Sequence, residues 1–127
     1  MTAYLMVAIG SGIGGALRHA VNIGTARVLG TGWPYGTFTV NVVGSFVMGV
    51  LAGYFAFRGT PTQASVLFLT TGILGGFTTF SAFSLDVVLL LERGRLDATA
   101  AYLLGSVALS VGALVLGLGL TRLLSSS

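Results

Sequence analysis

Apolar residues fill four long stretches of the chain, and short polar turns separate them. The stretches cover about residues 4–29, 37–57, 62–91 and 98–124, with turns expected at 30–36, 58–61 and 92–97. Each stretch is near or above the roughly 20 residues that a helix needs to cross a hydrocarbon core of about 30 Å. The pattern predicts an all-α integral membrane protein. We expect one domain over residues 1–127, with four transmembrane helices and both termini on one side of the membrane.

The third stretch changes character near its middle. Residues 75–84 read Gly-Gly-Phe-Thr-Thr-Phe-Ser-Ala-Phe-Ser, which combines two poor helix formers with two residues that are stiff at χ1. Irregular backbone at membrane depth persists only where it is buried in protein or lines a watery cavity. Broken helices of this kind bind ions through the carbonyls and amides that the break frees. We therefore expect the third helix to be broken near its middle and the break to handle ions.

Composition places the chain in a bilayer and argues against an enzyme. The chain is 54% hydrophobic and 7% charged, whereas a soluble domain carries about 25% charged residues. The arginines mostly flank apolar spans, which favours interfacial anchoring over nucleic-acid binding. One histidine, three scattered acids and no cysteine supply no catalytic set and no disulfide. The N-terminal segment lacks a cleavable signal pattern, so we expect it to be retained as the first span.

The basic residues give only a weak signal for orientation. Arg27, Arg93 and Arg95 belong to loops on one side, and Arg58 and Arg122 belong to the other. Because the arginine excess of short loops sets orientation, so slight a bias permits insertion in both directions. A short protein with few charges accounts for it equally well. Small residues also recur at helical spacing, which favours close helix packing and an oligomer. They are Gly10, Gly14, Ala16, Gly44, Gly49, Gly105, Gly112 and Gly119.

Polar side chains inside the spans are candidates for contact with an anion. Asn41, in the second span, can bond another helix or donate its amide to an anion. Tyr102, Ser106 and Ser110 are spaced i, i+4 and i+8, so they share one helix face. Their hydroxyls can form a polar track, or each serine can bond the carbonyl four residues before it.

Groups at the break give two further candidates. Phe80 and Phe83 share a face at i, i+3 spacing, and they either pack together or offer positive ring edges to a small anion. Such weak contacts suit conduction, which needs binding loose enough to release the ion. The carbonyls of Gly75 and Thr78 can ligate a hard cation such as Na⁺, or the break can be a kink that threonine hydroxyls repair.

Three ionisable residues lie within the spans. Arg18 is costly in lipid unless it faces water or reaches the interface, so it either snorkels or attracts anions at a pore mouth. We expect His19 at the interface, since no second histidine exists to build a metal site. Asp86 lies beyond the break, where we expect it to pair with an arginine or to face a vestibule.

Three motifs, in this order along the chain, resemble those of the Fluc (CrcB) family of bacterial fluoride ion channels. They are Gly-Ile-Gly-Gly-Ala-Leu-Arg-His at 12–19, Gly-Thr-Phe-Thr-Val-Asn-Val-Val-Gly-Ser-Phe at 36–46, and Gly-Ile-Leu-Gly-Gly-Phe-Thr-Thr-Phe-Ser-Ala-Phe-Ser at 72–84. The third is the most specific, and the resemblance covers nearly the whole chain. It implies a fluoride-selective passive channel that exports cytoplasmic fluoride as a multi-pass protein of the bacterial plasma (inner) membrane.

The resemblance also implies an assembly and a set of site residues. Fluc proteins are antiparallel, dual-topology homodimers with two pores and a central structural Na⁺ at the dimer interface. By motif position, main-chain carbonyls of Gly75 and Thr78 from each subunit hold the Na⁺, and Arg18 lies in the vestibule. The residues that match the fluoride pore are Asn41, Phe80, Phe83, Tyr102, Ser106 and Ser110. The implied partners are a second copy of the chain, the lipid bilayer and fluoride, with no nucleic acid.

Three positions depart from the family pattern. Ala82 stands where many members have threonine, and His19 replaces the more usual aromatic residue. Leu114 stands where some members keep another hydroxyl, so we expect the polar track to end at Ser110. These departures bear on the conduction rate more than on the identity of the family.

Two other functions fit part of the sequence. A proton-coupled exporter of the small multidrug type has a similar size and four spans, but it needs a carboxylate in its first helix, and Asp86 lies in the third span. A non-transporting membrane scaffold accounts for the glycine faces, but not for the break, the phenylalanine pair and the hydroxyl stripe together. A homodimer and a heterodimer with a paralogue both fit the sequence.

Overall fold

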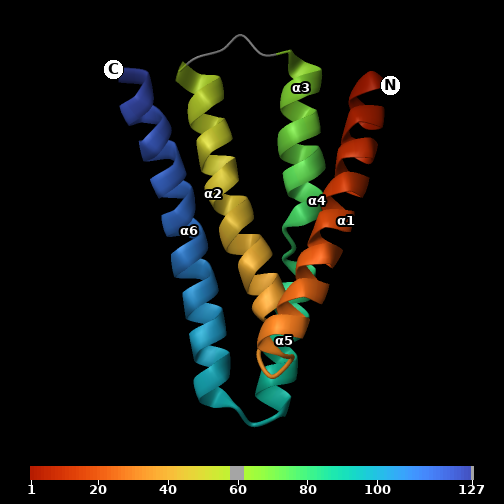
Figure 1. Cartoon of the computed structure of the whole chain (residues 1–127), viewed down its shortest axis with the longest axis vertical. Helices are drawn as coiled ribbons and strands as arrows, with labels where there is room; N and C mark the ends of the chain where they lie inside the picture. Colours follow the sequence, from red (N-terminus) through yellow and green to blue (C-terminus); the bar gives the residue numbers. More distant parts are fainter. Residues whose placement is uncertain (58–61, 127) are drawn as a thin grey trace.

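The computed structural model describes residues 1–57 and 62–126. The turn expected at 58–61 lies outside the described residues. Every regular element that the described residues form is helical (Figure 1). The long continuous helices are α1 (Thr2–Leu29), α2 (Tyr35–Phe57) and α6 (Leu96–Ser126). The remaining pass is divided into α3 (Gln63–Leu67), the π-helical segment η1 (Phe68–Leu74), α4 (Gly75–Phe77) and α5 (Ser81–Glu92).

The chain makes four helical passes, as the apolar pattern predicts. α1 begins and α6 ends at the same end of the molecule (Figure 1). At the other end, α1 stops at Gly30, whose φ is 86°, and Gly94, with φ 74°, lies between α5 and α6. Only glycine adopts such positive φ values readily. Turns therefore occur where they were expected, but they cover residues 30–34 and 93–95 rather than 30–36 and 92–97.

Three of the four passes are long and apolar enough to cross a membrane, as judged over the described residues. They are Tyr35–Ala56, Gln63–Glu92 and Leu96–Leu124. α1 has 28 residues, which is also sufficient length, but Arg18, His19 and Arg27 make it more polar. Large apolar side chains stay exposed on the outer helices, as a lipid solvent requires. The structure is that of a multi-pass membrane protein.

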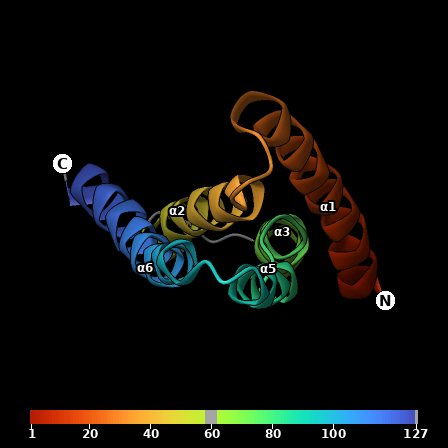
Figure 2. The same ribbon diagram turned by 90° about the horizontal axis from the view of Figure 1, so that it is seen from below.

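The helices pack mainly as two pairs. α2 lies against α6 along its length, and α1 lies against the divided third pass. Figures 1 and 2 place α1 and α6 on opposite flanks, with α2 and the third pass between them. Glycine permits the close approach, because an added Cβ at Gly10 would come within 2.7 Å of the Phe68 carbonyl oxygen. An added Cβ at Gly49 would collide with the main chain of Leu114 in the same way.

The packing role expected of the small residues holds for some of them only. Gly10, Gly14, Gly44 and Gly49 all meet a neighbouring helix. By contrast, Gly112 and Gly119 face open space within the part of the chain that the structure describes. On α6, Gly105 therefore contacts Phe38 of α2, whereas Gly112 and Gly119 do not pack against another described helix of the same chain.

The break in the third pass lies later than the glycine pair. Gly75 and Gly76 remain helical, and the backbone first leaves helical geometry at Thr78, with φ −85° and ψ 159°. The expected break near the middle of the third pass is confirmed. Gly76, which stays helical, allows close packing, because a Cβ there would collide with the main chain of Ser11 in α1.

Candidate functional site at the helix break

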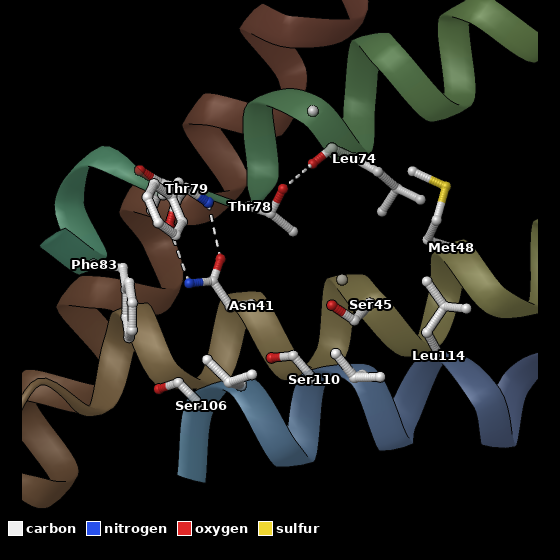
Figure 3. Close-up of a pocket in the computed structure, with 15 residues that line it drawn as sticks. Asn41, Ser45, Met48, Leu74, Thr78, Thr79, Phe83, Ser106, Ser110 and Leu114 are labelled. Carbon is white, nitrogen blue, oxygen red and sulfur yellow. Dashed lines mark hydrogen bonds between the residues drawn. The ribbon is translucent and has the colours of Figure 1, made fainter. Parts of the chain in front are cut away.

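A groove of about 370 Å³ opens beside the break, between α2, α6 and the third pass. We call it the break groove (Figure 3). Its walls are mostly apolar, with polar groups at a few positions, as is typical of a binding site. Apart from Arg18 and Tyr102, all the site residues predicted from the sequence lie in its lining. These are Asn41, Gly75, Thr78, Phe80, Phe83, Ser106 and Ser110.

Asn41 connects α2 to the break through two reciprocal hydrogen bonds (Figure 3). Its Nδ2 donates to the Thr79 carbonyl oxygen at 3.0 Å, and its Oδ1 accepts from the Thr79 N–H at 2.8 Å. The side chain thus satisfies both main-chain groups of a residue that has left the helix. The inter-helix bonding proposed for Asn41 is confirmed. An asparagine amide carries two N–H donors, so this pairing uses one of them.

The break frees the two carbonyls that the sequence singled out. In a continuous helix, the Thr79 N–H would donate to the Gly75 carbonyl and the Ala82 N–H to the Thr78 carbonyl. Here the Thr79 N–H donates to Asn41 Oδ1, and the Ala82 N–H donates to Thr79 Oγ1 at 3.1 Å. Within the described residues, no other donor replaces these amides at Gly75 or Thr78. Both residues line the break groove, and carbonyl oxygens are the kind of ligand that a hard cation prefers.

Threonine hydroxyls also form hydrogen bonds at the break, as predicted by the alternative of a kink that threonine hydroxyls repair. Thr78 Oγ1 donates to the Leu74 carbonyl at 2.9 Å, and the Thr78 N–H donates to the same oxygen at 3.0 Å. Thr79 Oγ1 is bonded to the Ala82 amide and to Ser81. This repair satisfies Leu74 and the start of α5, but not Gly75 or Thr78. The repaired kink and the cation site are therefore compatible.

Ser106 is the buried hydroxyl of the groove. It is only 4% exposed, and its Oγ has no hydrogen-bond partner among the described residues. Other helical hydroxyls bond the carbonyl four residues before them. They are Thr25, Thr39, Thr70, Ser84, Thr99 and Thr121. Since a buried polar group without a partner is costly, this atom is suited to an external acceptor or donor.

The two phenylalanines are in contact but differ in environment. Their ring centroids lie 5.7 Å apart. Phe83 is 6% exposed and belongs to the core, whereas Phe80 is 77% exposed on the surface of the chain. The Phe80 ring is thus among the exposed apolar side chains of the chain, and it lies directly beside the break.

Tyr102 does not line the break groove. It is fully buried, and its hydroxyl donates to Asp86 Oδ2 at 3.0 Å. Its ring packs against Phe83 at 5.1 Å and meets Trp33 edge-on at 5.2 Å. Of the two environments expected for Asp86, an arginine partner is not seen among the described residues, where Tyr102 bonds it instead. Asp86 lines a second cavity of about 340 Å³ together with Arg93, in agreement with the vestibule alternative.

Arg18 is half-buried against the break, outside the lining of the groove. Its Nε donates to the Gly76 carbonyl oxygen at 3.1 Å. His19, next to it, is exposed. α1 therefore contributes one directed hydrogen bond to the break, which the sequence did not predict.

Two residues that sequence reasoning missed lie in the groove. Ser45 follows Asn41 by one helical turn on α2, and Figure 3 shows it opposite Ser110 on α6. The i, i+4 spacing of Asn41 and Ser45 was a usable signal. Thr79 supplies the partner of Asn41, and nothing in the sequence identifies that long-range pair. Leu114, the expected end of the polar track, also lies in the lining.

Comparison with known proteins gives one consistent result. The family model described as "CrcB-like protein, Camphor Resistance (CrcB)" matches residues 5–118. A protein of Rhodopseudomonas palustris (strain BisB5) named "Fluoride-specific ion channel FluC" is 57% identical over 119 residues, which are 94% of this chain and 96% of that protein. A protein of Granulibacter bethesdensis with the same name is 53% identical over 124 residues, 98% of each chain.

These relatives carry the name of an ion channel. A channel moves an ion without making or breaking covalent bonds, in agreement with the expectation from composition that the protein is not an enzyme. The matches span nearly the whole chain, and they confirm the resemblance that the three sequence motifs indicated. The chain belongs to the CrcB-like family, whose curated relatives include fluoride-specific ion channels.

Proposed function

We propose that this protein is a fluoride-selective passive channel that exports cytoplasmic fluoride across the bacterial inner membrane. The observation that carries the proposal is the break groove, where unsatisfied Ser106, the Asn41 amide and the phenylalanine pair meet beside freed carbonyls. The printed names of the relatives support the identity of the ion.

The groove suits a small, strongly hydrated anion. Removing water from fluoride requires several donors in its place, and the hydroxyls of Ser106 and Ser110 and the amide of Asn41 are such donors. Ring edges of Phe80 and Phe83 add weak positive potential that does not trap the ion. Apolar Val107 and Leu114 also line the groove, and a path narrowed by such side chains would disfavour the larger chloride. Tyr102 acts from behind this lining through its contact with Phe83.

The working unit in this proposal is an antiparallel homodimer with two pores, in which α1 serves as the fourth span. A single chain leaves Phe80 77% exposed and leaves Gly112 and Gly119 facing open space within its described residues. A second copy would cover such surfaces. Because the arginine bias between the two sides is weak, insertion in both orientations is accessible.

A structural Na⁺ between the subunits fits the residues present. Gly75 and Thr78 each offer a carbonyl oxygen that has lost its helical donor, and hard cations prefer oxygen ligands. One chain supplies two such oxygens, so a second copy completes the set. A cation held there would add positive potential beside the anion path.

The two other functions have less support. A proton-coupled exporter needs an accessible carboxylate in its first helix, whereas α1 has none and Asp86 is bonded to Tyr102. A scaffold gives no reason for the buried, unpartnered hydroxyl of Ser106.

The test is efflux of fluoride and of chloride from liposomes that hold the purified protein, with no proton gradient imposed. Fast fluoride efflux with negligible chloride efflux is expected. Efflux that depends on a proton gradient would instead identify an exporter. If dimeric, membrane-inserted protein moves no fluoride with or without a proton gradient, the channel function is refuted. If the purified protein is monomeric, co-expression with a paralogue tests whether the channel is a heterodimer.

A further inference from the structure

We propose that Arg18 is a positioning residue for the third-helix break, where its hydrogen bond to Gly76 keeps the neighbouring carbonyls free to bind a cation. The inference deepens the proposed function, since it rests on the cation site at Gly75 and Thr78. It gives Arg18 a role within the protein that differs from attracting anions at a pore mouth.

The contact between α1 and the break is built for this bond. A glycine lies on each side of the contact. A Cβ on Gly14 would collide with the carbonyl of Ile73, and a Cβ on Gly76 would collide with the main chain of Ser11. The close approach lets Arg18, one turn beyond Gly14, reach the Gly76 carbonyl oxygen at 3.1 Å. Arg18 is half-buried there, so the bond is partly shielded from water.

The bond replaces one that the break removes. In a continuous helix, the Gly76 carbonyl would accept from the Phe80 N–H, but the chain leaves helical geometry at Thr78. Arg18 Nε takes that place. Without it, the Phe80 amide can return to Gly76 by local rewinding, which favours return of the neighbouring Thr79 and Ala82 amides to Gly75 and Thr78.

Two other side chains also keep the break from rewinding, by bonding main-chain amides. Asn41 holds the Thr79 amide away from Gly75, and Thr79 Oγ1 holds the Ala82 amide away from Thr78. Arg18 is the contribution from α1, and Asn41 the contribution from α2. The break is thus fixed from both sides, and among the described residues the carbonyls of Gly75, Phe77 and Thr78 are left without a helical donor.

The charge of Arg18 and its hydrogen bond predict opposite effects on cation affinity when Arg18 is replaced. A guanidinium is always protonated, so its positive charge weakens cation binding nearby, and removing the charge alone would tighten that binding. A residue that positions ligating groups acts in the other direction. Loss of such a supporting hydrogen bond typically weakens metal affinity by about 10–100-fold.

The experiment is a Na⁺ titration of thermal stability for the full-length protein in detergent, at constant ionic strength with choline as the replacement ion. Arg18→Met keeps the aliphatic stem and removes the donor, and His19→Gln, at the adjacent exposed position, is the matched control. We expect the Na⁺ midpoint of Arg18→Met to rise at least tenfold, with the control unchanged. An unchanged or lowered midpoint in Arg18→Met overturns the proposal.

Hydrogen exchange of the main-chain amides separates this inference from the proposed function. Exchange over residues 77–82 is expected to change in Arg18→Met and not in His19→Gln. If wild-type stability ignores Na⁺, the proposed cation site fails, and the exchange data alone decide the role of Arg18. If Arg18→Met does not fold, Arg18→Leu replaces it in both measurements, because leucine also removes the donor. Wild-type behaviour of Arg18→Leu would then overturn the proposal.

Discussion

Asn41 and Thr79 exchange two hydrogen bonds, one in each direction, at 3.0 and 2.8 Å. The pair joins the N-terminal part of α2 to a residue that has left the helix. It supports the irregular segment and diverts the amide that would otherwise bond Gly75. The same asparagine therefore stabilises the fold and prepares the site.

Asn41→Ala should lower both stability and fluoride flux. The substitution leaves the Thr79 N–H and carbonyl without their partner, and each orphaned group costs about 1–3 kcal/mol. Thermal unfolding in detergent and liposome efflux measure the two effects. Asn22→Ala is the matched control, since Asn22 lies in α1 and lines the second cavity. Equal effects of the two variants would contradict the role given to Asn41.

Ser106→Ala should raise stability while it lowers flux. The hydroxyl is buried without a partner, so its removal relieves a cost of about 1–3 kcal/mol. The same removal takes a donor from the proposed anion path. Ser84→Ala is the control, because Ser84 bonds the carbonyl of Phe80 at 3.0 Å and does not line the groove. A Ser106→Ala variant that is both less stable and fully conducting would refute this interpretation.

Phe80→Ile and Phe83→Ile should each reduce fluoride flux with the dimer intact. Loss of an edge contact worth about 0.5–1.5 kcal/mol corresponds to a roughly two- to twelvefold decrease. Only Phe83→Ile should also lower the unfolding temperature of the chain, since Phe83 is 6% exposed and Phe80 is 77% exposed. Efflux combined with size-exclusion chromatography tests the pair. Wild-type flux in both variants rules out the aromatic contribution.

Gly14→Ala should destabilise the protein, whereas Gly24→Ala in the same helix should not. A Cβ at Gly14 would collide with the main chain of Ile73 and Phe77, but Gly24 has open space around it within the described residues. Overpacking of this kind costs about 1–3 kcal/mol. Alanine in place of an unhindered helical glycine instead gains about 0.5–1 kcal/mol. Thermal unfolding of both variants measures the difference, and similar values would argue against tight packing of α1 on the third pass.

The amino-acid sequence determined the class of this protein and most of its site. The lengths of the apolar stretches require helices that span a bilayer, because only internally bonded backbone is stable in lipid. Spacing along single helices placed Ser106 and Ser110 on one face, and the structure puts both in the groove. The motif at 72–84 located a real break, and both carbonyls chosen from it are left without their helical donors.

Tertiary structure decided what depends on contacts between helices. The glycine pair stays helical, and Gly76 packs closely against Ser11 of α1, while the break follows at Thr78. Tyr102 shares a face with the serines, yet its hydroxyl turns to Asp86 on α5. Asn41 meets Thr79, and Arg18 meets Gly76, across 38 and 58 positions of the sequence. Periodicity describes one helix at a time, whereas these bonds depend on how helices distant in the sequence are set against one another.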